Sequence, residues 1–206
     1  MNQVIVAGRV VPEEPYFDLV GEKQSAFFRF HLAVPGTLKG GPKEFRIRCV
    51  AYGELATKLY GTIAPETFLC LEGHLQTRIL TTDQKPRWVA EVVGHRAVPL
   101  SKERIMNLVF LSGSLVDEPP YFDFVGPEKQ PFLRFHVAVP NESESGPKMS
   151  YIRCVAYDEN ACNLYDKLPK VAMIIVRGHL QVRALPQGQK PRWIMEVVVD
   201  EAEVIE

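Results

Sequence analysis

The sequence has little that would mark a membrane protein, a secreted protein or an enzyme. No run approaches the roughly 18 consecutive apolar residues of a membrane helix, so we expect no membrane partner. The start of the chain, MNQVIVAGRVV, has no basic leader or small-residue cleavage site, so we expect no signal peptide and a cytoplasmic location. The motifs G-x-x-x-x-G-K-[ST], G-x-G-x-x-G, H-E-x-x-H and G-x-S-x-G are missing, and nothing pairs Glu91 or Glu196 with an activated partner. No enzymatic activity is predicted.

Cysteine is scarce, and its spacing excludes two further classes of site. The four cysteines form no C-x-x-C pair, which argues against a zinc site and a thioredoxin-like site; they are Cys49, Cys70, Cys154 and Cys162. They are most simply interpreted as small hydrophobic residues in a reducing compartment. No histidine has a second ligand at suitable spacing, so no metal and no cofactor are predicted.

An excess of positive charge is also missing, because the formal net charge is -1. A strongly basic domain would have indicated nucleic acid directly. Any basic surface on this chain must therefore be local.

The chain does contain a long internal repeat with an offset of 105 residues. QKPRWVAEVV starts at Gln84 and QKPRWIMEVV at Gln189, and PYFD, RFH, RCVAY and GHLQ also occur twice at this offset. The period is far longer than the roughly 20 to 50 residues of solenoid repeats, so it indicates a duplicated domain. We expect one domain over residues 1–100, a short linker over 101–105 and a second domain over 106–206.

Alternation of apolar and polar residues dominates each copy. In 45–52 the apolar residues Phe45, Ile47 and Cys49 alternate with Arg46 and Arg48, and 150–157 repeats the pattern. Period two is typical of half-buried strands. We predict five strands per copy, in the first copy over 4–10, 27–34, 45–52, 69–79 and 87–97, with one short helix over 54–60 and again over 159–165. This order predicts an all-β fold of two tandem OB-fold barrels, each with five strands and one short helix.

The motifs MNQVIVAGRV, FFRFHLAV, FRIRCVAYGELA, LCLEGHLQTR and QKPRWVAEVV, in this order, resemble the bacterial single-stranded DNA-binding protein family. The resemblance extends to the tandem-barrel members, which pair as homodimers and so present four barrels. It implies sequence-independent binding of single-stranded DNA in replication, repair or recombination, at the bacterial nucleoid.

Several positions depart from the family pattern. The family commonly has an aromatic residue at the position of Arg46, which Tyr151 supplies in the second copy, and another at Leu80 and Leu185. The family's polar tail with an acidic tip has no counterpart before the final DEAEVIE, which leaves partner enzymes open.

Single-stranded DNA offers phosphates and base faces, so its binding surface needs cations interleaved with aromatic rings. The outer rows of the predicted strands provide both. The candidate binding residues are Arg46, Arg48, Tyr52, Arg78, Lys85, Arg87 and Trp88 in the first copy, and Tyr151, Arg153, Tyr157, Arg177, Arg183, Lys190, Arg192 and Trp193 in the second. Because Arg177 replaces Glu72, we expect the second copy to bind more strongly.

Several alternatives to this interpretation remain open. Exposed arginines are often only solubilising, and Tyr52 and Tyr157 could cap the barrel edge. Trp88 shares its parity with Ala90 and Val92, so it fits a core row as well as a rim. The barrels could also serve as a protein-interaction or assembly module with weak or no binding of nucleic acid. RNA is a weaker third possibility, because stacking barely distinguishes the two sugars.

The apolar first strands, Val4–Val6 and Val109–Leu111, would be exposed edges unless they are paired. We therefore expect two copies of the chain to pair through them as a homodimer.

Overall fold

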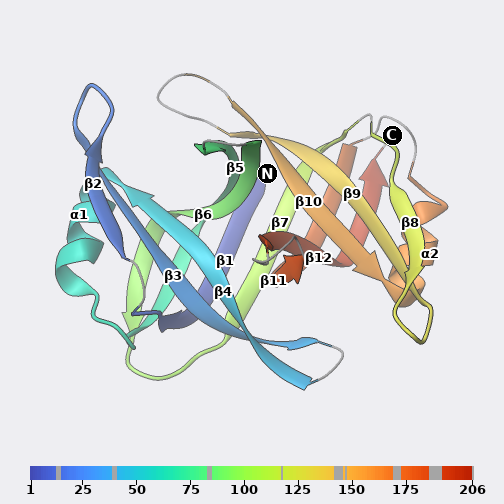
Figure 1. Cartoon of the computed structure of the whole chain (residues 1–206), viewed down its shortest axis with the longest axis horizontal. Helices are drawn as coiled ribbons and strands as arrows, with labels where there is room; N and C mark the ends of the chain where they lie inside the picture. The colour runs from blue at the N-terminus through green and yellow to red at the C-terminus, as the bar shows by residue number, and fades with distance from the viewer. Residues whose placement is uncertain are drawn as a thin grey trace.

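The computed structural model describes residues 1–12, 15–38, 41–82, 85–116, 118–141, 146, 148–168, 173–185 and 192–205, without the side chains of 37–38, 42, 80–82 and 85–87. Each repeat folds into a barrel with one helix at its outer end (Figure 1). The first repeat contains β1 (Asn2–Val10), β2 (Tyr16–Val20), β3 (Ser25–Leu38), β4 (Gly41–Tyr52), α1 (Gly53–Thr62), β5 (Phe68–Thr82) and β6 (Lys85–Leu100). The second contains β7 (Met106–Leu115), β8 (Tyr121–Val125), β9 (Gln130–Asn141), β10 (Lys148–Tyr157), α2 (Asp158–Tyr165), β11 (Met173–Leu185) and β12 (Arg192–Ile205).

The pairing of the strands confirms the OB-fold. In the first barrel β1 pairs with both β3 and β5, β5 pairs with β6, and β6 closes the ring by pairing in parallel with β4. The second barrel repeats this ring with β7, β9, β10, β11 and β12. The alternating residues Phe30, Ile47 and Leu71 are buried, as their period predicts, and belong to a hydrophobic core that runs through both barrels.

Each repeat contains one short strand that was not predicted from the sequence. The PYFD segments form the short strands β2 and β8, which pair with β3 and β9 outside the closed ring. The helices were predicted correctly and are slightly longer than expected. Among the described residues, no helix has the length and apolar character needed to cross a membrane.

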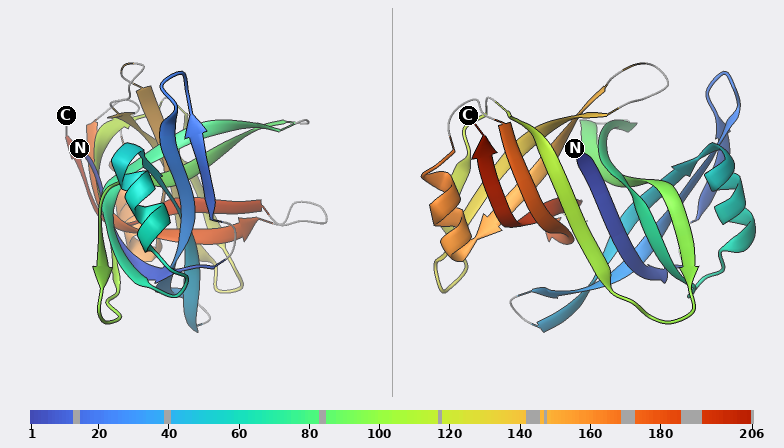
Figure 2. Two further views of the ribbon diagram at one scale, coloured as in Figure 1. Left: turned by 90° about the vertical axis from the view of Figure 1, so that its left-hand side faces the viewer. Right: turned by 180° about the vertical axis from the view of Figure 1, so that it is seen from behind.

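The two barrels are joined through their first strands. β1 and β7 pair antiparallel, with Val4 opposite Val109, so one sheet continues from barrel to barrel (Figures 1 and 2). The apolar edges that we expected to pair between two copies are therefore already paired within one chain. A contact between two copies must use another surface.

Asparagine side chains extend the ladder that β1 and β7 form with their neighbours. The Asn2 amide donates to the carbonyl oxygen of Leu75 at 2.7 Å and its oxygen accepts from the Leu75 N–H at 3.0 Å. Asn107 makes the same pair of bonds to Leu180, both at 2.8 Å. A primary amide here replaces a backbone peptide group, and it does so at the same place in each repeat.

The hairpins β3–β4 and β9–β10 cross from one barrel towards the other along two unlike seams. At one seam the Ser150 hydroxyl accepts from the Thr77 N–H at 3.1 Å, and Thr77 Oγ1 accepts from the Tyr151 N–H at 3.0 Å. The equivalents of Thr77 and Ser150 at the other seam are Val182 and Phe45, both buried. One seam is thus polar and hydrogen-bonded, and the other is apolar.

We predict that Gly73→Ala destabilises the fold by about 1–3 kcal/mol, the usual cost of overpacking. A Cβ atom at Gly73 would lie 1.9 Å from the carbonyl oxygen of Val93, at the bulge where β5 changes register against β6. Gly61→Ala in α1 is the matched control, because a Cβ atom there meets nothing within 4 Å. Urea unfolding of both variants measures the difference, and equal stability would contradict the packing.

Candidate nucleic-acid interface

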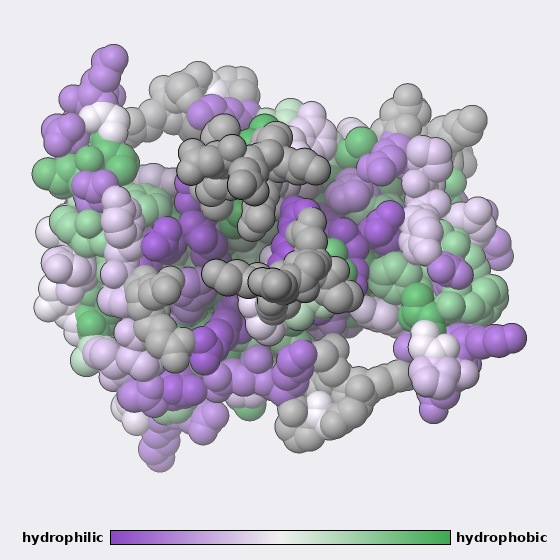
Figure 3. All heavy atoms as spheres, viewed as in Figure 1, coloured by the Kyte–Doolittle hydropathy of each residue, from purple (hydrophilic) through white to green (hydrophobic). Residues whose placement is uncertain are grey.

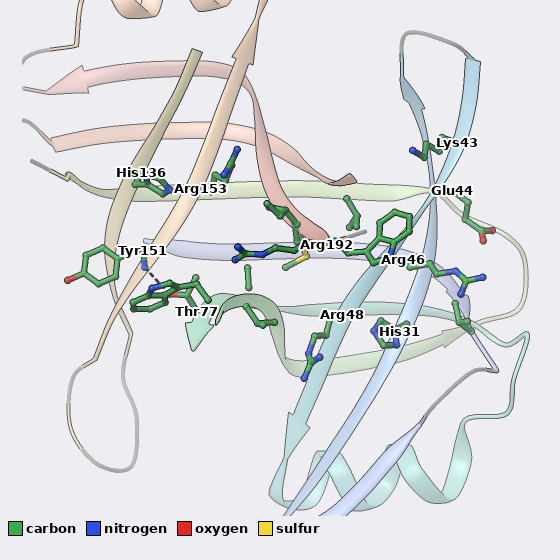
Figure 4. Close-up of a pocket in the computed structure, with 18 of the residues that line it drawn as sticks. His31, Lys43, Glu44, Arg46, Arg48, Thr77, His136, Tyr151, Arg153 and Arg192 are labelled. Atoms are coloured by element: carbon green, nitrogen blue, oxygen red, sulfur yellow. Dashed lines mark hydrogen bonds between the residues drawn. The ribbon is translucent and has the colours of Figure 1, made fainter. Parts of the chain in front are cut away.

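A groove of about 1440 Å³ lies between the two barrels and is lined by side chains of both. In Figure 4, His31, Arg46 and Arg48 come from the first barrel, and Arg153 and Arg192 from the second. Hydrophilic residues gather in the middle of this face of the molecule (Figure 3). The hairpins β5–β6 and β11–β12 project from the barrels to the same side (Figure 2, left).

The structure brings together about half of the residues predicted for the interface. Those that line the groove are Arg46, Arg48, Trp88, Tyr151, Arg153, Arg192 and Trp193. Tyr52, Arg78, Tyr157 and Arg183 do not line it. The side chains of Lys85 and Arg87 are not described, and Lys190 lies outside the described residues.

Both tryptophans lie at the surface of the groove rather than in the core. Trp88 is 52% exposed and Trp193 is 63% exposed. Trp88 packs edge-on against Tyr151 of the other barrel, with ring centroids 5.9 Å apart. Two tryptophans and one tyrosine therefore offer ring faces inside the same groove.

A buried glutamate positions the arginines of each barrel, which the sequence did not reveal. Glu91 is fully buried and its carboxylate lies 3.0 Å from Arg48 Nε and 2.8 Å from Arg78 Nε. The amide of Gln76 donates to the same carboxylate at 2.9 Å. Charge pairing and hydrogen bonds together satisfy a carboxylate that would otherwise be costly to bury. The sequence feature that could have predicted this cluster is the recurrence of two arginines and one glutamate at equivalent positions of both repeats.

The second barrel repeats this cluster around Glu196. Its carboxylate lies 2.8 Å from Arg153 Nε and 2.5 Å from Arg183 Nε, and it accepts from the Gln181 amide at 2.9 Å. The Gln181 amide also donates to the Tyr157 hydroxyl at 3.0 Å. The predicted binding tyrosine and arginines of this barrel thus belong to one hydrogen-bonded network.

Each cluster keeps a positive surplus, because a third arginine adjoins it. Burial lowers the pKa of Arg48, and the carboxylate of Glu91 raises it. The positive charges of the neighbouring Arg29 and Arg78 lower this pKa further. The same influences act on Arg153, whose pKa is lowered first by burial. In each barrel two guanidinium groups pair with one carboxylate and a third lies nearby, so the local potential favours an anion although the chain as a whole is almost neutral.

The structure places Arg177 away from the groove. It lies in the part of β11 that pairs with β7, opposite Phe110, and it forms an ion pair with Glu201. Its replacement of Glu72 therefore gives no additional charge to the groove. The expectation that the second copy binds more strongly loses the reason we gave for it.

His136 of the groove carries little charge at neutral pH. Burial lowers the pKa of His136, which lies 3.4 Å from Glu118. Within the described residues, no group of three potential ligands from His, Cys, Asp and Glu is arranged to hold a metal ion.

The fold and the groove together define a class: two linked OB-fold barrels that enclose an aromatic groove bordered by cationic clusters. Residues 106–205 match the model of the Single-strand binding protein family. The match covers the second repeat, and the first repeat has the same strand order and the same buried cluster.

Solved structures with the same fold include two from Thermus aquaticus. A deletion mutant of its single-stranded DNA binding protein is similar with a TM-score of 0.80 and 21% identity, covering 100% of this chain and 95% of that one. The wild-type protein is similar with a TM-score of 0.80 and 20% identity, covering 100% and 93%. At this identity the likeness shows the fold of both repeats. The search of curated proteins finds no match.

We predict that Glu91→Gln destabilises the chain by about 3 kcal/mol, because it leaves half-buried guanidinium groups without their carboxylate. Glu66→Gln is the control, since Glu66 pairs with Arg9 at an exposed site, where the loss is at most about 1 kcal/mol. Urea unfolding compares the two variants. A cost for Glu91→Gln no larger than that of the control would show that the cluster does not stabilise the barrel.

Proposed function

We propose that the chain binds single-stranded DNA in the groove without recognising its sequence, during replication, repair or recombination in the bacterial cytoplasm. Rings of Trp88, Tyr151 and Trp193 supply surfaces on which any base can stack. Arg48 and Arg153 supply positive charge for the phosphates between the bases.

The observation that carries this proposal is the exposure of the tryptophans beside the cationic clusters. A protein would gain nothing in stability from leaving two indole rings more than half exposed, whereas a ligand with stacked bases would cover them. Guanidinium groups held by a buried carboxylate are also pre-organised, so little side-chain entropy is lost when a phosphate binds.

Titration with oligo(dT) tests the proposal, with intrinsic fluorescence as the readout. The chain has only two tryptophans and both line the groove, so stacked bases should quench the emission. The affinity should fall with rising salt, with a logarithmic slope of about -0.7 for each phosphate neutralised. Absence of quenching and of any mobility shift at low salt would instead favour a protein-interaction module. Equal affinity for oligo(U) would extend the ligand to RNA.

Trp193 offers a matched pair of variants for the stacking contact. Trp193→Phe keeps a ring and should retain most of the affinity, whereas Trp193→Ala should lose about tenfold, as expected for one stacked base. Fluorescence anisotropy of a labelled oligo(dT) measures both without relying on tryptophan emission. Equal affinities of the two variants would remove Trp193 from the binding surface.

We also propose that two copies associate as a homodimer and present four barrels. The outer face of the sheet β6-β5-β1-β7-β11-β12 offers a surface for this contact. Its centre is apolar, because Ile5 pairs with Leu108, which is 38% exposed, and Phe110 lies on the same face of β7. Covering this patch would remove apolar area from water.

Light scattering should give twice the mass of one chain, and Leu108→Asp should reduce it to the mass of one. Leu19→Asp is the control, because Leu19 is 50% exposed on β2, away from this face. A single-chain mass for the unaltered protein at micromolar concentration would contradict the dimer.

A further inference from the structure

Each barrel carries a second group of aromatic rings outside the groove, here called the outer rows. In the first barrel Tyr16, Phe27 and Tyr52 follow one another on β2, β3 and β4, with ring centroids 6.2 and 5.4 Å apart. In the second barrel Tyr121, Phe132 and Tyr157 repeat the row, with distances of 6.3 and 5.5 Å. Of these six residues, only Tyr52 and Tyr157 were predicted from the sequence as binding residues.

The rows present ring surface to solvent. Tyr16 and Tyr121 are both 43% exposed, whereas Phe27, in the middle of its row, is buried against Val50 and Val93. The phenylalanine therefore belongs to the barrel's packing. The outer tyrosines extend the aromatic surface beyond what this packing requires.

Hydrogen bonds hold the outer tyrosines in place. The Tyr16 hydroxyl donates to Asp18 Oδ2 at 2.6 Å, and the Asp18 carboxylate also accepts from the Leu19 N–H at 2.8 Å. Tyr121 donates to Asp123 in the same way at 2.6 Å. Fixing the hydroxyl orients the ring, so a planar group that stacks on it loses little further freedom.

Each outer tyrosine is accompanied by an arginine. Arg29 Cζ lies 5.0 Å from the ring centroid of Tyr16, and Arg134 Cζ lies 4.6 Å from that of Tyr121. Arg29 Nε is buried and finds no hydrogen-bond acceptor among the described residues. Within the described part of the chain, neither arginine forms an ion pair with a carboxylate.

The outer rows are continuous with the groove. On β3, Phe27, Arg29 and His31 share one face, and on β4, Arg48 and Tyr52 lie opposite them in the same sheet. His31 and Arg48 line the groove, so Arg29 lies between the groove and Tyr16. Since β2 and β8 lie at the two far ends of the molecule in Figure 1, the rows continue the groove in both directions.

We propose that the outer rows are additional base-stacking sites, which carry the single strand from the groove to both ends of the molecule. One base stacks at Tyr16 and one at Tyr121, and Arg29 and Arg134 each bind an adjoining phosphate. This inference rests on the proposed function, because it assigns further positions to the same ligand.

The variant Tyr16→Leu/Tyr121→Leu tests the outer rows, since leucine keeps apolar bulk but offers no π-face. Binding is measured by anisotropy with labelled oligo(dT) of increasing length, from about 4 nucleotides to about 32, which covers the range of site sizes for two barrels. The unaltered chain should gain affinity until the strand reaches both rows. The variant should match it on the shortest strands and bind the longest about tenfold to a hundredfold more weakly, as expected for one or two lost stacks.

Two controls separate the outer rows from general effects. Tyr16→Phe/Tyr121→Phe keeps the rings but loses the orienting hydroxyls, so it should bind long strands much more tightly than the leucine variant and only slightly more weakly than the unaltered chain. Tyr60→Leu/Tyr165→Leu removes exposed tyrosines from the helices, where they stack on Phe17 and Phe122, and should also leave binding unchanged. Thermal melting of every variant establishes that it is folded.

The outcomes distinguish this inference from the proposed function. If the unaltered chain binds no oligo(dT) of any length, the function itself fails. If it binds long strands and the leucine variant binds them equally well, binding in the groove is retained as the function and the proposal of stacking on the outer rows is rejected. An equal loss on short and long strands would also overturn them, because it would place Tyr16 and Tyr121 within the groove's own contacts.

Discussion

The antiparallel pairing of β1 with β7 is the interaction on which the rest of the structure depends. It fixes the two barrels relative to one another along a backbone ladder from Asn2 opposite Leu111 to Ala7 opposite Met106. Only with that placement do the outer faces of β4 and β10 approach from opposite sides and enclose a groove. The connector between β6 and β7 is short, so the pairing costs little loop entropy and both apolar edges are covered within the chain.

The second constraint is electrostatic. A chain with a net charge of -1 can offer an anion-binding surface only if its cations are concentrated. Glu91 and Glu196 concentrate them, because each buried carboxylate holds two arginines beside the groove. Each cluster of one carboxylate and two guanidinium groups therefore keeps a net positive charge. The same carboxylates make the barrel depend on the arginines, so the proposed binding surface and the fold share one set of ion pairs.

Much of this architecture follows from the sequence, because period-two alternation and the offset of 105 residues are local or repeated signals. These signals predicted the two barrels and their helices, and they predicted that Arg46, Arg48 and Tyr151 face outward. The strand β2 was missed because five residues between loops carry too short a pattern. The pairing of the first strands was assigned to the wrong partner, since a sequence shows that an edge is apolar but does not identify the chain that covers it.

The charges could not be placed from the sequence for a related reason. Arg177 and Arg183 have the same parity on one strand, yet Arg177 pairs with Glu201 and Arg183 with Glu196. The twist of a barrel strand turns one face toward different surroundings along its length. Whether an outward arginine is available to a ligand therefore depends on contacts across the sheet.

The duplication also frees the two halves to diverge where they meet. Tyr151 packs against Trp88, whereas Arg46 stands at the equivalent position of the first barrel. The hydrogen-bonded seam of Thr77 and Ser150 is matched by the apolar residues Val182 and Phe45. A groove built from two identical subunits would look the same from either end. Here the two ends differ, so a polymer with distinct 5′ and 3′ termini would meet different side chains in its two orientations.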